Sequence, residues 1–291
     1  MVWSLLDRIG GKLLSPSSSS SSDTPSLATR VIEVRGKAVR TAVVGTGSRT
    51  LVALHGYPDT LQVFARLAEQ VRPGCRLVAV DFPGQGRSAV DVDVIAPAAR
   101  AGWLVAVLDA LSIDRVSLFA HDMGAMAALE LALLAPARVE RVVVSNALLS
   151  STAPTSATLR VLRASGSYRF FLPAFPRSAV ARCLATFLPK SAPLSTAVRI
   201  DIEQAFADPS VTSTTVAVCD AAEPWLTQGL ARFASLSMPI TALWGSAGGH
   251  FPREHALALP GANVVDVDGG CHWLVWQDPA RVWETATRAH R

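Results

Sequence analysis

Short runs of β-branched and other apolar residues alternate along the chain with segments in which apolar positions recur every three or four residues. The runs predict strands, and the segments between them predict helices that cover a sheet. Because most runs are apolar at nearly every position, we expect a mostly parallel sheet that is buried on both faces. The expected strands are residues 31–34, 41–44, 50–54, 76–80, 115–119, 141–144, 240–244 and 262–267, of which the first two form a hairpin. The expected covering helices are residues 97–111, 123–134 and 279–290.

The alternation stops between residues 148 and 237, which separate two of the expected strands. This segment predicts several short helices, because proline interrupts a helix interior. Its prolines include Pro173, Pro176, Pro189, Pro193 and Pro209. An insertion between core strands should lie above the carboxyl edge of the sheet, where open α/β sheets bind their ligands. We therefore expect a core of residues 31–147 and 238–291 that carries a helical cap of residues 148–237.

The first 30 residues differ in composition from the rest, and we expect a helix followed by a serine-rich linker with a serine run at 17–22. The apolar positions at helical spacing are Val2, Leu6, Ile9 and Leu13. This helix would pack on its own domain or, in the alternative, make weak contact with a membrane surface or a partner. Asp7 and Arg8 interrupt its apolar run and no basic segment precedes it, so we do not expect a secretory signal.

Of the 291 residues, half are hydrophobic and 17% are charged, a composition that excludes a disordered chain. The net charge of +4 is too small and too scattered for a nucleic-acid binding surface. The four cysteines show no C-x-x-C spacing, so we expect neither a disulfide framework nor a metal site, and the expected location is the reducing cytoplasm. No apolar stretch reaches the roughly 20 residues of a transmembrane helix. The expected partner is a small-molecule substrate, and the oligomeric state stays open.

Four turns at the ends of expected strands carry the candidate chemistry. They are residues 55–58 (HGYP), 81–88 (DFPGQGRS), 119–125 (FAHDMGA) and 270–273 (GCHW). The third lies between a strand and a helix, which is the position of a nucleophile elbow with the pattern G-x-S-x-G. Here Ala120 replaces the first glycine and Asp122 replaces the serine. Small residues at such a turn leave room for a nucleophile in a strained backbone conformation.

With these four turns in this order, the chain resembles the α/β-hydrolase superfamily, and within it the branch of epoxide hydrolases and haloalkane dehalogenases, which has an aspartate nucleophile. The resemblance covers about residues 31–291. It implies an α/β-hydrolase fold, with helices on both faces of a mostly parallel sheet and a helical cap inserted between core strands. It also implies a cofactor-independent reaction through an alkyl ester on Asp122.

Asp122 would act as the nucleophile, because a carboxyl group with a reference pKa of about 3.9 is already ionised at neutral pH. His272 has a reference pKa near neutrality and would deprotonate the water that hydrolyses the ester. The backbone N–H groups of Tyr57 and Met123 would form the oxyanion hole. The alternatives are a helix N-cap for Asp122 and an exposed loop imidazole for His272.

The sequence lacks an obvious acid to orient His272, because the turn at residues 244–249 contains no carboxylate. Asn146, after the preceding expected strand, could hold the ring through a hydrogen bond, as asparagine does in cysteine-protease triads. Asp268 is the alternative, although it could simply be solvated. The residues expected to have structural roles are His55, His121 and Cys271.

The leaving group distinguishes the two kinds of enzyme in this branch. An epoxide opens to an alkoxide that needs a proton donor, and Tyr168, the one tyrosine in the expected cap, is either this donor or ordinary packing. A departing halide needs an N–H donor, commonly from the residue after the nucleophile, and Met123 offers none through its side chain. The aromatic residues that would line an apolar pocket, or else pack in the cap, are Trp225, Phe170, Phe171 and Phe175.

We therefore expect a hydrolase that opens an epoxide in a small to medium apolar substrate. A haloalkane dehalogenase-like hydrolase with the same mechanism is one alternative. A non-catalytic ligand-binding homologue is the other, because a fold alone does not establish activity and the missing acid could mark a loss of turnover.

Overall fold

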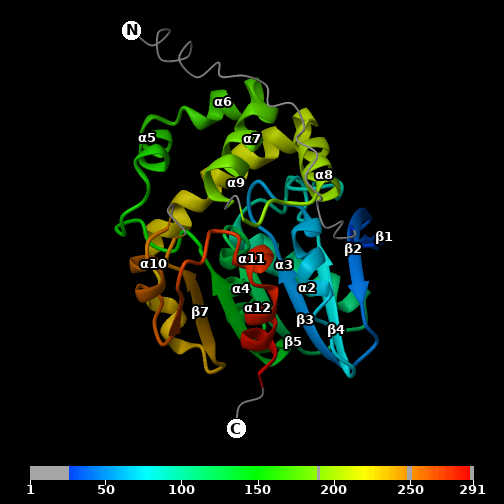
Figure 1. The fold of residues 1–291 in the computed structure, drawn as a ribbon. Helices are drawn as coiled ribbons and strands as arrows, with labels where there is room; N and C mark the ends of the chain where they lie inside the picture. Colours follow the sequence, from blue (N-terminus) through cyan, green and yellow to red (C-terminus); the bar gives the residue numbers. More distant parts are fainter. Residues whose placement is uncertain (1–25, 189–190, 248–250, 289–291) are drawn as a thin grey trace, which may run out of the picture.

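The computed structural model describes residues 26–188, 191–247 and 251–288 (Figure 1). Within these residues, eight strands form one sheet in the order β1-β2-β4-β3-β5-β6-β7-β8. The strands are β1 (Arg30–Val34), β2 (Lys37–Val44), β3 (Arg49–Leu54), β4 (Cys75–Val80), β5 (Val116–His121), β6 (Val139–Ser145), β7 (Ile240–Gly245) and β8 (Asn263–Val267). β2 pairs antiparallel with β1 and β4, whereas the pairs from β4 to β8 are parallel. Each expected strand is present within a few residues of its predicted bounds.

Two hydrophobic clusters cover the two faces of the sheet, because successive side chains of a strand point to opposite faces. In β3, Val52 belongs to one cluster and its neighbour Leu51 to the other. The first cluster includes α3 (Pro97–Ala110) and α4 (Gly124–Leu134), and the second includes α2 (Ala65–Ala68), α11 (Leu274–Gln277) and α12 (Pro279–Thr287). Helices of the segment between β6 and β7 add residues to both clusters. The nearly continuous apolar runs of the sequence therefore correspond to strands buried on both faces.

Several short elements complete the core. They are α10 (Glu254–Leu257) and the 3-10 helices η1 (Leu61–Phe64), η2 (Pro136–Arg138) and η3 (Ala231–Ser235). The sequence did not predict α2, α10 or α11, because a four-residue helix is too short to show an apolar period. Pro97 and Pro279 begin α3 and α12, as expected of proline in a first helical turn.

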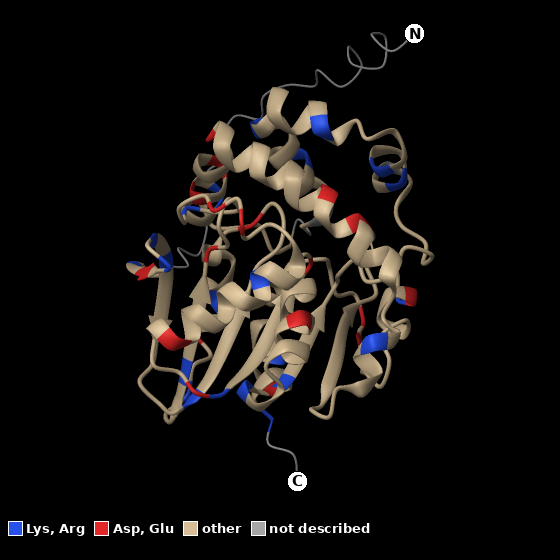
Figure 2. Ribbon diagram, turned by 180° about the vertical axis from the view of Figure 1, so that it is seen from behind, with Lys and Arg blue, Asp and Glu red and all other residues tan. Residues whose placement is uncertain are grey.

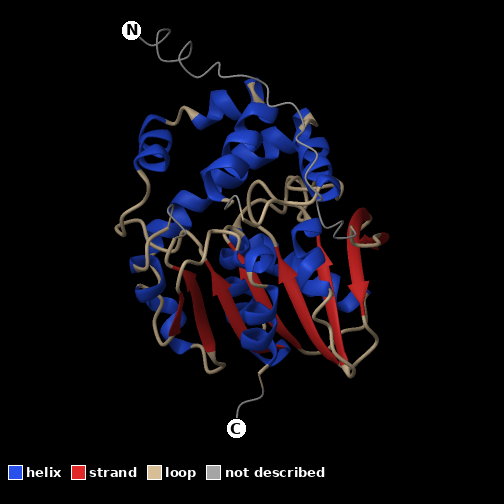
Figure 3. Ribbon diagram, viewed as in Figure 1, coloured by secondary structure: helices blue, strands red, loops and turns tan. Residues whose placement is uncertain are grey.

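Five helices connect β6 with β7, and we call them the cap. They are α5 (Ala157–Ser165), α6 (Tyr168–Ala174), α7 (Pro176–Phe187), α8 (Thr196–Phe206) and α9 (Pro209–Gln228). Figure 3 shows the cap at the end of the sheet to which the arrows of the parallel strands point. Asp201 of α8 connects the cap with the core, since it binds the Arg40 guanidinium at 2.9 Å and accepts a hydrogen bond from Thr60 Oγ1 at 2.7 Å. Burial alone would raise the pKa of Asp201, but hydrogen bonds from Arg40 and Thr60 hold it below its ordinary value.

The described chain begins at Ser26, so the predicted N-terminal helix and the serine run lie outside the described residues. Leu27 is buried, and its backbone exchanges two hydrogen bonds with the side chain of Gln62. None of the helices in the described ranges is both long and apolar enough to cross a membrane.

Candidate active site

The turn between β5 and α4 presents Asp122 at the carboxyl edge of the sheet. Asp122 has a φ of 49°, in the left-handed region that residues other than glycine rarely adopt. Gly124 permits the sharp turn, because a Cβ atom there would lie 2.7 Å from the carbonyl oxygens of Leu54 and His55. A strained residue at a strand-to-helix turn has the geometry of a nucleophile elbow.

The Asp122 side chain is buried, since the residue is 6% exposed, and it accepts two backbone hydrogen bonds. The Tyr57 N–H donates to Oδ2 at 3.0 Å, and the Met123 N–H is the second donor. Burial raises the pKa of Asp122 to about 7, although the two hydrogen bonds act to lower this pKa. Burial therefore holds this carboxyl group nearer to its neutral form than the reference pKa of an exposed aspartate implies.

The two N–H donors come from separate turns that approach each other closely. Gly56 allows this approach, because a Cβ atom there would lie 2.5 Å from the Cβ of Asp122. The N-cap alternative does not fit, since Met123 occupies the N-cap position of α4. The Tyr57 and Met123 N–H groups converge on one carboxyl group, which is the arrangement that an oxyanion hole requires.

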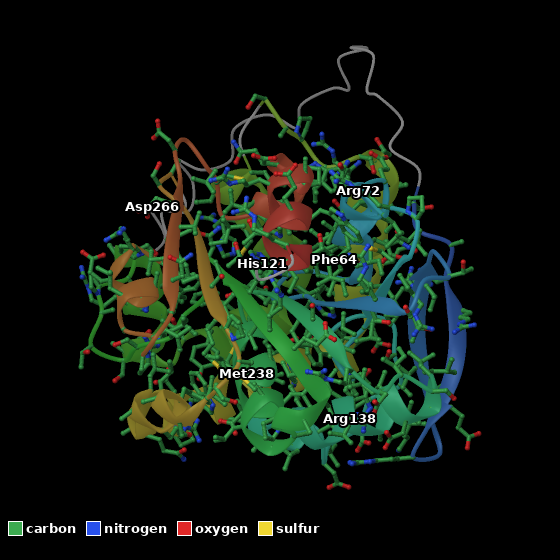
Figure 4. The ribbon with its side chains drawn as sticks, turned by 90° about the horizontal axis from the view of Figure 1, so that it is seen from below. Phe64, Arg72, His121, Arg138, Met238 and Asp266 are labelled. Atoms are coloured by element: carbon green, nitrogen blue, oxygen red, sulfur yellow. The ribbon has the colours of Figure 1, made fainter. Side chains whose placement is uncertain are left out.

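His272 lies in the turn after β8 and is 3% exposed, so the alternative of an exposed loop imidazole is wrong. Its ring centroid lies 4.6 Å from that of His121, the residue before Asp122, and 4.9 Å from that of Trp273. Figure 4 shows His121 near the middle of the molecule. The imidazole of His272 is therefore buried beside His121, the residue before Asp122.

Asn146 follows β6 with a φ of 44° and connects the turn of His272 with the sheet. Its Nδ2 donates to the carbonyl oxygens of Cys271 at 3.1 Å and His272 at 2.9 Å, and its Oδ1 accepts from the Gly245 N–H at 3.0 Å. Both polar atoms of the amide are thus bonded to backbone groups. The predicted bond from Asn146 to the imidazole is replaced by contacts that position the backbone of His272. Asp268, the other candidate, is exposed.

Asp59 is a buried acid that the sequence analysis missed. Its Oδ1 accepts a hydrogen bond from Trp273 Nε1 at 2.7 Å, and its Oδ2 lies 3.6 Å from His121 Nε2, too far for a hydrogen bond. Burial, together with the charge of Asp122, raises the pKa of Asp59 to about 8, although the Trp273 bond lowers it. Burial lowers the pKa of His121 to about 3, so at neutral pH both members of this pair are uncharged. The signal in the sequence was an acid directly after the HGYP turn.

The structural roles predicted for His55 and Cys271 agree with their contacts. His55 Nε2 accepts a hydrogen bond from the Phe82 N–H at 3.1 Å, and its Nδ1 donates to the carbonyl of Gly56 at 2.9 Å. Cys271 is 5% exposed within the second hydrophobic cluster. For His121, in contrast, the neighbours are the Asp59 carboxyl group and the His272 ring.

The hydroxyl of Tyr168 donates a hydrogen bond to the Asp220 carboxylate on α9. Burial and this hydrogen bond raise the pKa of Tyr168 above its ordinary value. The Arg169 guanidinium lies over the Tyr168 ring at 5.1 Å from its centroid. The hydroxyl proton of Tyr168 is thus held by Asp220, so the structure favours the packing interpretation of Tyr168.

The cap aromatics do not line a pocket at the elbow. Trp225 is 4% exposed and its Nε1 donates to Glu130 at 2.6 Å, so it packs between the cap and α4. The three phenylalanines are exposed, Phe170 at 67%, Phe171 at 47% and Phe175 at 55%. The interpretation that these four aromatic residues line an apolar substrate pocket is therefore wrong.

Two cap thiols lie near the elbow instead. Cys183 of α7 and Cys219 of α9 are half-buried, and both are free. Burial first, and then the charge of Asp122, raise the pKa of each thiol to about 12. Both thiols therefore stay protonated at neutral pH on the cap side of Asp122. Within the described ranges, no group of histidine, cysteine and acidic side chains is suited to hold a metal ion.

Residues 49–279 match the family model of the α/β hydrolase fold. The chain belongs to this family. Among curated proteins, an epoxide hydrolase of Caballeronia sordidicola is 34% identical over 114 residues, which are 38% of this chain and 34% of that protein. A haloalkane dehalogenase of Psychrobacter cryohalolentis is 31% identical over 108 residues, 34% of each chain. The chain thus spans about a third of the length of these curated relatives.

Solved structures share the α/β-hydrolase fold over nearly the whole chain. The haloalkane dehalogenase DbeA from Bradyrhizobium elkani USDA94 superposes with a TM-score of 0.74 at 20% identity and covers 89% of this chain and 95% of its own. The epoxide hydrolase CorEH superposes with a TM-score of 0.70 at 16% identity and covers 89% and 96%. At these identities the likeness establishes the fold, and the chain is accordingly a hydrolase-fold protein with a mostly parallel sheet.

Proposed function

We propose that this α/β hydrolase opens an epoxide in a small to medium apolar substrate through an ester on Asp122. The observation that carries the proposal is the buried Asp122 carboxyl group in a left-handed turn, with the N–H groups of Tyr57 and Met123 directed at it. A serine at this turn would need a base to remove its proton, whereas a carboxylate attacks a saturated carbon directly.

In the first step, an ionised Asp122 oxygen forms a bond to an epoxide carbon while the bond from that carbon to the ring oxygen breaks. The resulting alkoxide takes a proton from the cap side, where Cys183 and Cys219 are protonated titratable groups near Asp122. The product of this step is a hydroxyalkyl ester of Asp122.

In the second step, His272 removes a proton from a water molecule, which attacks the carboxyl carbon of the ester. The N–H groups of Tyr57 and Met123 stabilise the oxyanion that forms on the Asp122 carboxyl group. When this intermediate collapses, the bond from the carboxyl carbon to the alkyl oxygen breaks, and the departing alkoxide takes the proton that His272 removed from the water. A diol leaves, and one oxygen of the water remains in Asp122. Asn146 supports this step by holding the backbone of His272 at the ends of β6 and β7.

The same ester mechanism would serve a haloalkane, and a haloalkane dehalogenase is among the relatives. The side chain of Met123 supplies no N–H for a departing halide, and the Trp273 indole beside His272 already donates to Asp59. These two observations support an epoxide over a haloalkane.

Turnover of apolar epoxides in heavy-oxygen water, followed by mass spectrometry of the peptide that contains Asp122, tests the proposal. We expect diol formation and incorporation of the label into Asp122 after several turnovers. Asp268→Asn is the matched control, because that acid is exposed, and it should label as the wild type does. Diol formation without label in the peptide would contradict the ester, and halide release from haloalkanes without epoxide turnover would select the dehalogenase.

A further inference from the structure

The connection between α6 and α7 exposes an apolar segment that the proposed reaction does not use. Residues 170–176 read FFLPAFP, so none of these seven side chains carries a charge or a hydrogen-bonding group. Five of the seven residues are exposed, and the other two are half-buried. The ring centroid of Phe171 lies 5.6 Å from that of Phe170 and 6.4 Å from that of Phe175, so the three rings form one aromatic patch. We call residues 170–176 the apolar tip.

Contacts on the inner side of α6 hold the apolar tip on the outside of the cap. Tyr168 is buried and its hydroxyl is bonded to Asp220 of α9. Leu172 is half-buried and lies four residues further on, which places it on the same side of α6 as Tyr168. Figure 1 shows α6 on the side of the cap that faces away from the sheet. The exposed rings of Phe170 and Phe171 therefore face outward, away from the core.

Arginines lie on both sides of the apolar tip. Arg169 precedes it, Arg177 follows it, and both are exposed. Residues 147–200 contain no acidic residue. Arg177 forms no ion pair with a described residue, and the same holds for the exposed Arg160 of α5 and Arg182 of α7. The outer cap helices thus carry cations around an apolar patch.

The two acids within α9 do not cancel this charge, because each is already paired. Asp220 lies 2.9 Å from Arg169, and Glu223 lies 2.8 Å from Arg163. A second copy of this chain would bring like charges together at the tip, which disfavours self-association there. The tip also offers no side-chain hydrogen-bonding group that could align a protein partner. A fluid, negatively charged surface needs no such alignment.

We propose that the apolar tip docks the protein on an anionic lipid bilayer. The three phenylalanine rings enter the boundary between headgroups and acyl chains, where the apolar side chains of interfacial segments lie. Arg177, with Arg160 and Arg182, binds lipid phosphates, because a long arginine side chain keeps its guanidinium at the headgroups while its stem lies along apolar surface. This docking goes beyond the proposed reaction and does not depend on it.

Sedimentation of the full chain with vesicles tests the docking, with phosphatidylcholine alone compared with phosphatidylcholine mixed with phosphatidylserine. We expect the wild type to bind the mixed vesicles at least about tenfold more tightly, and less tightly as salt is added. A variant with Phe170→Ser, Phe171→Ser and Phe175→Ser should lose at least about tenfold in affinity, because it removes the apolar surface that enters the lipid. Arg177→Gln should lose roughly fivefold on the mixed vesicles only.

Two substitutions on the core serve as matched controls. Leu134→Ser changes an exposed apolar residue at the end of α4, which runs from the elbow away from the cap. Arg49→Gln changes an exposed arginine at the start of β3, at the opposite edge of the sheet from the cap. Both variants should bind the mixed vesicles as the wild type does.

Failure of the wild type to sediment with the mixed vesicles would overturn the proposal. Equal binding by the triple serine variant would also overturn it, since the lipid contact would then lie elsewhere in the chain. A dimer of the wild type that this variant does not form would assign the tip to self-association instead. Asp122→Asn should bind vesicles normally, so a failure of the proposed reaction is distinguishable from a failure of the docking.

Discussion

The elbow and the cap differ in how their polar side chains are held. At the elbow, Asp122 and His272 are nearly inaccessible, and backbone groups of neighbouring turns fix their positions. In the cap, α5 to α7 contain five arginines and no acidic residue, and their exposed phenylalanines contact solvent. Figure 2 shows the basic residues on the outer cap helices and the acidic ones on α9.

In the proposed function, this difference would separate the chemistry from the choice of substrate. The sheet brings four turns together at one edge, so in the proposed reaction the backbone of the core would determine which group attacks and which N–H groups stabilise charge. The cap packs on the core through apolar side chains such as Trp225 and through polar contacts such as Asp201 with Arg40. It contributes thiols rather than a free phenol near Asp122. We therefore expect substitutions at the elbow to change the reaction steps far more than substitutions in the cap.

Asp122→Asn should have the largest effect on activity, a loss of at least about 10⁴-fold in turnover with no ester formed. The same change should stabilise the fold above pH 7. The pKa of Asp122 is raised from 3.8 to about 7 by burial, so the folded state binds more protons than the unfolded state between these values and loses stability as the pH rises. Single-turnover mass spectrometry and Tm measurements check both points. Residual ester formation in this variant would disprove the assignment of the nucleophile.

His272→Gln should reduce the second step by about 10²- to 10⁴-fold while leaving the first step largely intact. The ester should therefore accumulate, and intact-protein mass spectrometry should show the added mass of one substrate. If the variant instead fails to form the ester, His272 would act in the first step as well, and the division between the two steps would not hold.

Asp59→Asn should change the pH dependence of stability without removing activity. Burial raises the folded-state pKa of Asp59 to about 8. Between about pH 4 and pH 8 the folded state therefore keeps a proton that the unfolded state has already released, and the stability of the wild type falls as the pH rises through this interval. An asparagine does not titrate, and the variant should gain stability relative to the wild type across this interval, by on the order of a few kcal/mol. Denaturant unfolding at several pH values measures this gain. A difference that does not vary with pH would mean that Asp59 titrates normally.

Tyr168→Phe should have the smallest effect, because its hydroxyl is bonded to Asp220 rather than directed at the substrate. We expect turnover within about twofold of the wild type and a loss of roughly 1 to 3 kcal/mol in unfolding free energy from the lost hydrogen bond to a charged group. A much larger loss in turnover would restore Tyr168 as the proton donor and weaken the contrast between elbow and cap.

Much of the core followed from the sequence, because strand runs and turn residues are local signals. The pattern predicted a strand at residues 115–119 and a helix at residues 123–134, which the structure has as β5 and α4 with slightly shifted bounds, and it placed Asp122 between them. Short helices such as α2 and α11 were missed, since four residues do not reveal a period. The raised pKa of Asp122 was also missed, because a pKa depends on burial by residues distant in the sequence.

The amino-acid sequence alone determined the order of strands and helices, the elbow with its aspartate and the turn that carries His272, because apolar periodicity and glycine placement act over a few residues. Only the tertiary structure decided how these groups meet. It placed Asn146 against the backbone of His272 and Asp59 beside His121, and it directed Tyr168 to Asp220. The physical reason is that hydrogen-bond partners, desolvation and charge pairing depend on distances between residues far apart in the chain, which packing alone sets.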